Sequence, residues 1–466
     1  MAVSGKINMA YLEYSKFKIK FIIILSLIIL FQSCLMGINY DIQGESIGRK
    51  WTFIIYMAAD NDLESAAIAN FNELEAVRYG SAPISILVLL DRSPHFDQTN
   101  GNWTDTRLFE IKSDPGGLTA TMKSPRLNCP ELGLSKDTET NLNTADPMVL
   151  SRLIDFAKRV YPAEHYALFM WGHGTGWRSS ADIDSSYTPQ KAIAFDDTVG
   201  QYMSLPAFGR AITDKGLSMI GFDTCFGAVL EVVYQIKNSA ELFVGSQGLI
   251  LSTGWNYTAL FTDFLKKPNL SINDLGDSIQ KQFSERYAGL ANASISQIQL
   301  AQVENLFINF NNFSGVIADS ITTGATRDIV RNQILNNIEK HFFTSFPSDL
   351  YIDISDFKNK ILAISVNITS NNAQQTAIAN SANELGNALS LAIPASWAYN
   401  GTSNKIGVHV IPIVGIGVPA ATHELEYIRD SIAIDKNAFV QNSLHWVPNA
   451  LPRSNSLLDK LFYWVF

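Results

Sequence analysis

The stretch YALFMWGHGTGW (residues 166–177) joins a continuous apolar run directly to a histidine held between two glycines. A run of large apolar residues without polar alternation is typical of a strand that is buried on both faces of a sheet. His173 follows this run, and the flanking Gly172 and Gly174 place little side chain around its imidazole ring. The pattern therefore predicts a buried strand that ends by presenting one histidine.

Four further apolar runs predict buried strands, and the segments between several of them carry apolar residues at helical spacing. The five predicted strands are 52–58, 84–91, 165–172, 218–225 and 241–247. The predicted helices among them are 60–78, 145–162 and 226–238. Strands that alternate with helices favour right-handed crossovers, and hence a parallel sheet with helices on both faces. No GxGxxG follows the first strand, which disfavours dinucleotide binding.

Two residues with catalytic potential follow neighbouring strands. Ligands of open parallel sheets bind beyond the carboxyl ends of the strands, and both His173 and Cys225 lie at such ends. A nucleophilic cysteine needs a lowered thiol pKa, which an imidazole or the N-terminus of helix 226–238 would supply. Backbone N–H groups near Gly174 and Cys225 are expected to form an oxyanion hole. The alternative is a turn histidine and a small buried thiol, each without chemistry.

The composition excludes several classes of function. The chain has 466 residues, 47% of them hydrophobic and 17% charged, which fits a globular protein of one large domain with an appendage, or of two to three domains. The net charge is −9 and no basic stripe is present, so nucleic acid is not expected as a partner. The seven histidines include no HExxH motif, which disfavours a metallohydrolase.

The N-terminus carries the pattern of an export signal. A lysine-rich segment precedes the apolar run 21–31, which is followed by Ser33 and Cys34. This order is typical of a secretory signal, and an apolar run of eleven residues is short for a permanent membrane span. Cys34 stands where bacterial lipoproteins carry the lipidated cysteine, although Phe31 replaces the usual aliphatic residue. A plain cleaved signal and an uncleaved anchor stay open as alternatives.

The cysteine count favours a free thiol. If Cys34 is lipidated, Cys129 and Cys225 remain, and two cysteines are too few for a disulfide framework. They could pair with each other, but the surroundings of Cys225 favour a free side chain.

The sequence predicts four parts. They are a lipoprotein-type signal peptide (1–33), a tether (34–50), an α/β domain (51–260) and a mainly helical C-terminal region (261–466). Within the last part, the β-like run 405–418 is expected either to return to the main sheet or to form a small sheet of its own.

Several blocks of this sequence resemble one known family. The segments YALFMWGHGTGW (166–177) and IGFDTCFGAVLEVVYQI (220–236) closely resemble the His and Cys blocks of the clostripain-like cysteine peptidases, in the caspase–gingipain–legumain group. The blocks 51–64 and 194–212 are similar to the same family, with weaker similarity through 351–357. The resemblance implies a caspase-like, mostly parallel sheet flanked by helices, and an endopeptidase that hydrolyses peptide bonds.

The resemblance also implies roles for particular residues. Cys225 matches the nucleophile, and His173 matches the dyad histidine that donates a proton to the leaving amine. Asp223 matches an acid of the S1 pocket that favours Arg or Lys at P1; a carboxylate bonded to local N–H groups is the alternative. Lys191 is the expected self-cleavage site. No cofactor is required, and no metal ligand is assigned.

Two features leave alternatives open. Calcium is retained as a cofactor to be tested, although Asp60 and Asp62 after the first strand are expected to cap the next helix rather than bind calcium. The loop 246–257 departs from the family pattern, because Gln247 stands where relatives commonly have Glu and the loop carries no acid. A catalytically weak surface binding module is therefore the alternative function, and a thiol-dependent acyl or peptidyl transferase is a second.

The expected partners and location follow from these interpretations. We expect protein or peptide substrates and no nucleic acid, with the membrane contacted only through an N-terminal lipid anchor. The expected location is the cell envelope or the extracellular space, as a bacterial membrane lipoprotein.

Overall fold

The computed structural model describes most of the chain after the tether. The described residues are 48–114, 116–119, 121–176, 192–290, 293–337, 340–342, 350–399 and 406–410. They belong to one compact unit, Ser46–Phe466. The signal segment 1–33 with its neighbour Cys34, most of the tether, and Lys191 lie outside the described residues.

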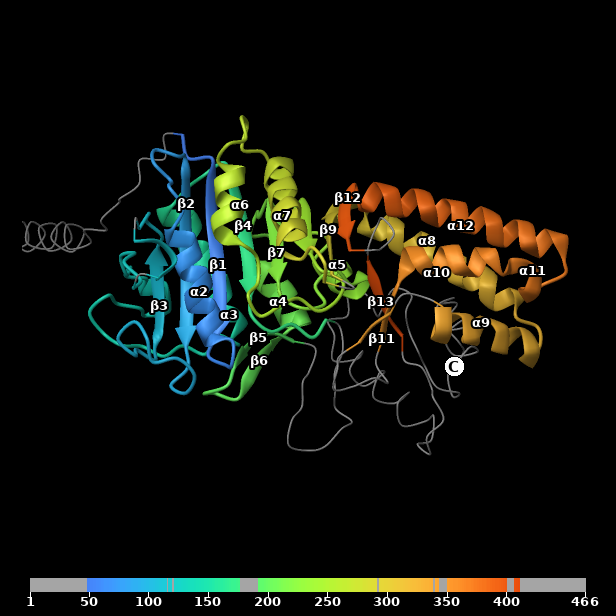
Figure 1. Cartoon of the computed structure of the whole chain (residues 1–466), viewed down its shortest axis with the longest axis horizontal. Helices are drawn as coiled ribbons and strands as arrows, with labels where there is room; N and C mark the ends of the chain where they lie inside the picture. The colour runs from blue at the N-terminus through green and yellow to red at the C-terminus, as the bar shows by residue number, and fades with distance from the viewer. Residues whose placement is uncertain are drawn as a thin grey trace, which may run out of the picture. The chain divides into compact units, whose positions relative to one another are not determined.

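The main sheet has eight strands in the order β12-β9-β8-β7-β4-β1-β2-β3 (Figure 1). Its strands are β1 (Trp51–Ala59), β2 (Ile84–Arg92), β3 (Thr106–Glu110), β4 (His165–Trp171), β7 (Met219–Asp223), β8 (Leu242–Gly245), β9 (Ser294–Gln299) and β12 (Ala395–Ala398). The central strands from β8 to β2 pair in parallel, and β3, β9 and β12 pair antiparallel at the two sides. All five predicted strands form, with ends within two residues of those predicted, so the mostly parallel sheet is confirmed.

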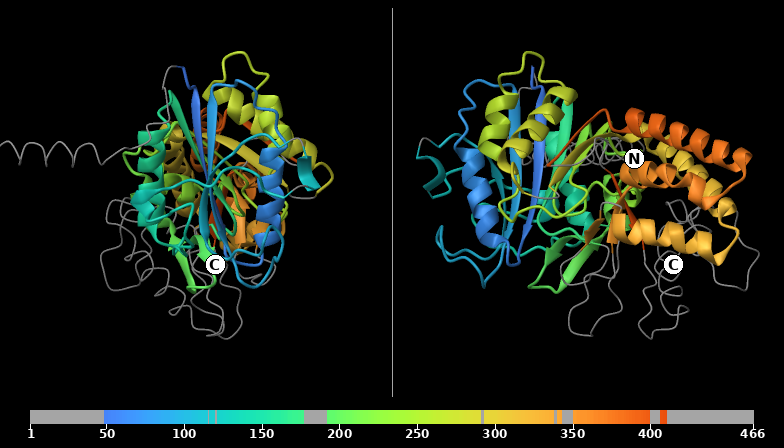
Figure 2. Two further views of the ribbon diagram at one scale, coloured as in Figure 1. Left: turned by 90° about the vertical axis from the view of Figure 1, so that its left-hand side faces the viewer. Right: turned by 45° about the vertical axis from the view of Figure 1, so that its right-hand side comes forward.

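Helices cover both faces of this sheet, as the view along the sheet in Figure 2 (left) shows. Consecutive side chains of β1 point to opposite faces: Ile54 and Tyr56 enter one apolar cluster, and Phe53 and Ile55 enter the other. The first cluster includes side chains of α3 (Pro147–Val160), α4 (Leu205–Ile212), α5 (Leu230–Gln235) and α8 (Val303–Ser320). The second includes side chains of α2 (Glu64–Glu75), α6 (Tyr257–Phe264) and α7 (Ile272–Arg286). Burial on both faces explains why the strand sequences lack polar alternation.

The start of α3 agrees with the sequence signals, and the start of α2 does not. Asp146 caps α3 by accepting a hydrogen bond from the Met148 N–H at 2.8 Å. Helix α2 begins without a side-chain cap. The prediction that Asp60 and Asp62 cap this helix is therefore wrong, because the carboxylate of Asp60 accepts from the N–H of Thr198 and that of Asp62 bonds elsewhere, as described below.

The described residues of the C-terminal part are mainly helical, as predicted. The remaining helices there are α9 (Gly324–Asn337), α10 (Ile354–Ala363), α11 (Ser365–Ile368) and α12 (Asn372–Ala392), with a 3₁₀ turn at Leu300–Gln302. Two further 3₁₀ turns, at Gly117–Thr119 and Pro130–Leu132, lie in the α/β part. The strands β9 and β12 of this part extend the main sheet beyond β8. Across the described residues, no helix combines the length and the apolar character needed to cross a bilayer.

Two small sheets accompany the main one. They are β5 (Ala192–Asp196) with β6 (Gln201–Ser204), and β10 (Lys340–Phe342) with β11 (Leu350–Asp353) and β13 (Gly407–Val410). Strand β13 is the described piece of the predicted run 405–418, and it pairs with β11 rather than with the main sheet. The backbone N–H of Gly407 also donates to the carbonyl of Ala228, so this small sheet contacts the segment after Cys225.

The helix predicted at 226–238 is much shorter than expected. Helix α5 begins only at Leu230, five residues after Cys225. The intervening backbone bonds to the segment after β8 instead: the N–H groups of Phe226 and Ala228 donate to the carbonyls of Gly248 and Ser246, at 3.0 and 2.8 Å. The prediction that Cys225 begins a helix is therefore wrong, and the N-terminus of α5 does not adjoin the thiol.

Candidate active site

The strand register brings the two predicted catalytic residues to one edge of the sheet. Strands β4 and β7 are parallel neighbours, and Trp171 lies opposite Asp223 in their register. His173 and Cys225 each follow two residues after this pair. The contact is close, because a Cβ built on Gly174 would lie 2.6 Å from the carbonyl oxygen of Cys225.

The two glycines beside His173 each meet a geometric requirement. Gly172 has a φ of +132°, in a region that other residues rarely adopt, and its Cβ position lies 3.0 Å from the carbonyl oxygen of Ala58. Gly174 allows the chain to pass against Thr224 and Cys225, where a side chain would collide with backbone. The glycines flanking His173 therefore fix where the histidine lies relative to Cys225.

Replacing Gly174 with alanine tests this contact. The new methyl group would collide with the carbonyl of Cys225, so the nucleophile must shift, and a displacement of about 1 Å can cost 100-fold in rate. We expect Gly174→Ala to lower kcat/KM for a peptide substrate about 100-fold. Gly386→Ala in α12 is the matched control, since neither glycine has a positive φ and the atom that a Cβ would meet at Gly386 is the flexible end of the Lys358 side chain, at 3.1 Å. Equal activity of Gly174→Ala and the parent would contradict the proposed close contact.

His173 is oriented by an acidic residue that the sequence did not assign to it. The Nε2 atom lies 2.6 Å from Oδ1 of Asp62, and the ring meets the edge of Phe195 at 5.9 Å. The carboxylate favours the tautomer with its proton on Nε2, which leaves Nδ1 to act on a substrate. The histidine side chain is 42% exposed, so a substrate can reach it.

The thiol of Cys225 contacts the loop after β8. The N–H of Ile250 donates to Sγ at 3.4 Å. Burial raises the pKa of the Cys225 thiol and the nearby charge of Asp223 raises it further, while the Ile250 N–H acts in the opposite direction. Within the described chain, no hydrogen bond joins this thiol to His173. The expected lowering of the thiol pKa is therefore not found in this conformation.

The N–H of Cys225 is an available donor for the oxyanion hole predicted at Gly174 and Cys225. No acceptor for the Cys225 N–H occurs among the described residues, whereas Gly174 forms an isolated bridge with Ile193. Phe226, which follows, has a left-handed φ of 54° that turns the chain away after the nucleophile. A small pocket borders this turn and is lined by Gly174, Gly176, Ile193, Leu205, Phe222, Thr224, Cys225, Phe226 and Val232. The oxyanion hole stays a prediction.

Asp223 lies beneath the loop 246–257. Its carboxylate accepts hydrogen bonds from the N–H of Trp255 at 3.1 and 3.0 Å and from the hydroxyl of Tyr257 at 3.0 Å. Burial raises the pKa of Asp223 to about 7 against the effect of these donors. This bonding matches the alternative that the sequence left open, although the donors come from a distant loop. The S1 role of Asp223 stays a prediction.

The acid-free loop is held by side chains from the helices around it. The N–H of Leu251 donates to the hydroxyl of Tyr287 at 3.1 Å, and the amide of Asn70 donates to the carbonyl of Thr253 at 3.0 Å. Gln247, which stands where relatives commonly have Glu, is fully buried. The loop therefore covers both the thiol and Asp223 in this conformation.

The two described cysteines are free and differ in environment. Cys129 is fully buried, and burial raises the pKa of its thiol to about 12. Cys225 is partly exposed beside His173. The prediction of a free Cys225 is confirmed, and Cys129 offers an inert thiol for comparison.

Comparison with known proteins agrees with this geometry. The sequence model of the clostripain family matches residues 55–408, which include both predicted catalytic residues. The chain belongs to the clostripain family. The family resemblance seen in the sequence, and the classification as a clostripain-like cysteine peptidase, are thereby confirmed at the level of the family.

Relatives of this clostripain family member support the same conclusion. Clostripain from Hathewaya histolytica is 27% identical over 229 residues, which cover 46% of this chain and 42% of that protein, so the chain matches less than half of its length. Two solved structures are similar in fold, each with 18% identity and a TM-score of 0.54. One is an inactive zymogen C11 protease from Parabacteroides distasonis, covering 82% of this chain and 95% of that one. The other is a secreted C11 cysteine protease from Bacteroides thetaiotaomicron in complex with an irreversible peptide inhibitor, covering 83% and 99%. The predicted caspase-like fold class is confirmed.

Proposed function

We propose that this protein is an exported cysteine endopeptidase that hydrolyses peptide bonds through a dyad of His173 and Cys225. The observation that carries the proposal is the pairing of β4 with β7, which places both residues two positions beyond one register pair. The packing of Gly174 against Cys225 supports it, because it holds the two segments together at the sheet edge.

The proposed reaction has two steps. The Sγ of Cys225 attacks the substrate carbonyl carbon, and the thiol proton passes through His173 to the leaving amine nitrogen as the C–N bond breaks. Water then attacks the resulting thioester, which releases the acid product and restores the thiol. Asp62 holds the imidazole in place through Nε2 in both steps. The N–H of Cys225, for which no acceptor occurs among the described residues, donates to the oxyanion of each tetrahedral intermediate.

We further propose cleavage after Arg or Lys, with Asp223 as the acid that binds the basic P1 side chain. The support is its position two residues before the nucleophile, on the same strand end. The backbone of Gly254 lies against this carboxylate, since a Cβ there would be 2.6 Å from Oδ2. A basic side chain must therefore displace the 253–255 segment to reach Asp223.

The pH dependence of P1 preference tests the role of Asp223. Its carboxyl group has a pKa near 7, so it is neutral below this value and gains its charge above it. We expect the ratio of kcat/KM for P1 Arg over P1 citrulline to rise at least about tenfold as the pH increases through 7. Asp223→Asn should lower this ratio and make it independent of pH. A large ratio that persists unchanged in Asp223→Asn would contradict the proposal.

Export and maturation are proposed from sequence signals alone. The segment 1–33 supports export, with lipidation at Cys34 as the anchor, and Lys191 is the proposed self-cleavage site. A secreted protease is among the solved structures with a similar fold.

One observation favours the alternative of a catalytically weak binding module. The loop 246–257 covers Asp223 and contacts the thiol through Ile250, so the described conformation has no open S1 site. If that loop never moves, irreversible peptide inhibitors will not label Cys225 whatever their P1 residue. Labelling by such an inhibitor would favour the peptidase instead.

A further inference from the structure

A small sheet from the C-terminal part of the chain contacts the segments that follow both proposed catalytic residues. Its strands β11 and β13 lie next to α5, the helix that follows Cys225 (Figure 1). Gly407 of β13 forms a parallel bridge with Val229, and its N–H donates to the carbonyl of Ala228 at 3.0 Å. Backbone hydrogen bonding therefore joins the small sheet to the chain just after the proposed nucleophile.

One side chain of this sheet, Tyr351 in β11, contacts both segments. It is 1% exposed, and its hydroxyl donates to the backbone carbonyl of Thr175, two residues after His173, at 3.1 Å. Its ring packs against that of Phe226, the residue after Cys225, with the ring centroids 5.1 Å apart and the ring planes tilted by 32°. A single tyrosine therefore contacts the chain just after the histidine and just after the cysteine.

Gly176 shows how closely these groups fit together. A Cβ built on this glycine would lie 2.6 Å from the hydroxyl oxygen of Tyr351 and 2.9 Å from Cβ of Phe226. Its backbone also has a left-handed φ of 67°, which favours glycine. The chain after His173 is therefore packed directly against both the tyrosine hydroxyl and the residue that follows Cys225.

The turn after Cys225 has a conformation that depends on its surroundings. Phe226 has a left-handed φ of 54°, which a residue with a side chain keeps only where neighbouring contacts hold it there. Phe226 is fully buried, and Tyr351 supplies one of the contacts of its ring. Strained backbone of this kind is common at functional sites, where it directs a neighbouring group. The neighbouring group here is the proposed nucleophile.

We propose that Tyr351 is a positioning residue for the dyad of His173 and Cys225, so that the C-terminal part supplies one element of the active site. The inference rests on the proposed function. Its hydroxyl fixes the backbone two residues after the histidine, and its ring supports the turn after the cysteine. These contacts are to the chain beyond the two catalytic residues, so the tyrosine acts through their positions. A displacement of about 1 Å can slow such a reaction about 100-fold.

Removing only the hydroxyl tests the contact with the histidine segment. Tyr351→Phe keeps the ring against Phe226 and deletes the hydrogen bond to Thr175. We expect kcat for a peptide amide with Arg at P1 to fall about tenfold, and KM to change less than about twofold, because the groups that bind the substrate are unchanged. Tyr351→Leu removes the ring as well, and its kcat should fall about 100-fold.

Tyr79→Phe is the matched control. Tyr79 lies between α2 and β2, at the edge of the sheet opposite to Cys225, and its hydroxyl donates to the backbone carbonyl of Leu74 at 2.7 Å. The two Tyr→Phe substitutions delete the same type of hydrogen bond, so each should lower the unfolding temperature by about 1–4 °C. Only Tyr351→Phe should lower kcat. The proposal is overturned if Tyr351→Phe keeps the kcat of the parent, or if both variants lower it equally.

Hydrogen exchange measures the same contact without peptide cleavage. Exchange of backbone amides is followed by mass spectrometry in peptides that span 166–176, in the full-length parent and in both Tyr→Phe variants. We expect exchange there to become about fivefold faster in Tyr351→Phe and to keep the parent's rate in Tyr79→Phe. An unchanged rate in Tyr351→Phe would overturn the proposal. If the parent cleaves no peptide, the proposed function fails, and the exchange rates still decide whether Tyr351 holds this segment.

Discussion

Replacing Cys225 with alanine is expected to abolish peptide cleavage, while replacing Cys129 with alanine leaves it intact. Cys225 is partly exposed, and its sulfur is the protein atom that bonds covalently to the substrate in the proposed reaction. Cys129 is buried, and desolvation raises the pKa of its thiol to about 12, so it cannot serve as a nucleophile near neutral pH. The two substitutions remove the same sulfur atom from very different surroundings.

Steady-state cleavage of a peptide library with basic and neutral P1 residues measures this difference. We expect Cys225→Ala to lower kcat/KM by about 10⁴-fold or more. Cys129→Ala should change activity less than about twofold and cost about 1 kcal/mol of stability, because it leaves a small cavity in the core. Residual cleavage by Cys225→Ala, or a folded but inactive Cys129→Ala, would contradict the assignment of Cys225 as the nucleophile.

His173→Ala is expected to have the second-largest effect, about 10³-fold in kcat, because proton transfer to the leaving amine is lost. Asp62→Asn should have a smaller effect of about 10-fold to 100-fold, since Asp62 touches the imidazole and not the substrate. We expect this loss to fall on kcat with KM little changed, because the residue positions a catalytic group.

Asp197→Asn provides the matched control for Asp62→Asn. Asp197 is exposed, and its carboxylate acts on His173 through its charge. Asp197→Asn removes the same negative charge as Asp62→Asn. Its kcat should stay within about twofold of the parent. If Asp197→Asn and Asp62→Asn lower kcat equally, the hydrogen bond from Asp62 has no special role and the effect is that of net charge.

The sequence predicted the central sheet well because buried parallel strands have a strong local signature. The runs at 52–58, 84–91 and 165–172 are mostly apolar, and the structure buries almost every one of these side chains. Once the strand order is known, the meeting of His173 and Cys225 follows from chain direction alone. These features depend on the spacing of apolar residues and on the order of the strands, and both can be inferred from a single sequence.

Other features depend on contacts that local sequence does not encode. Backbone hydrogen bonds from Phe226 and Ala228 to the distant segment 246–248 set the start of α5. The apolar run alone predicted a longer helix. The approach of Asp62 to His173 likewise joins residues 111 positions apart.

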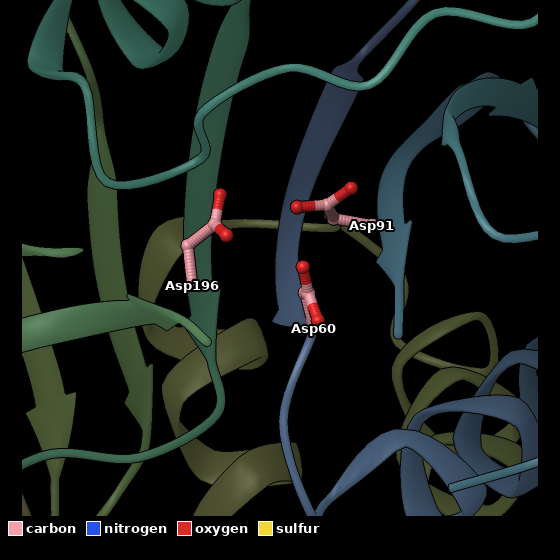
Figure 3. Close-up of side chains that lie close together, drawn as sticks. All are labelled: Asp60, Asp91 and Asp196. Carbon is pink, nitrogen blue, oxygen red and sulfur yellow. The ribbon is translucent and has the colours of Figure 1, made fainter. Parts of the chain in front are cut away.

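The close approach of the three buried aspartates Asp60, Asp91 and Asp196 (Figure 3) was only partly predictable from the sequence. Asp60 and Asp91 come at the carboxyl ends of adjacent parallel strands, so their proximity could have been inferred from the predicted order. Asp196 reaches them through β5, which pairs antiparallel with β6 outside the main sheet and corresponds to none of the predicted strands. The interpretation of Asp60 as a helix cap failed because a single acidic residue after a strand fits several roles.

Trapping the acyl-enzyme tests the central claim most directly. The purified protein is mixed with a peptide ester that carries Arg at P1, quenched with acid within a fraction of a turnover, digested at low pH and analysed by mass spectrometry. We predict that the acyl mass appears on the peptide containing Cys225 and on no peptide containing Cys129. Cleavage of the ester with no acyl group on Cys225 would contradict the proposed mechanism.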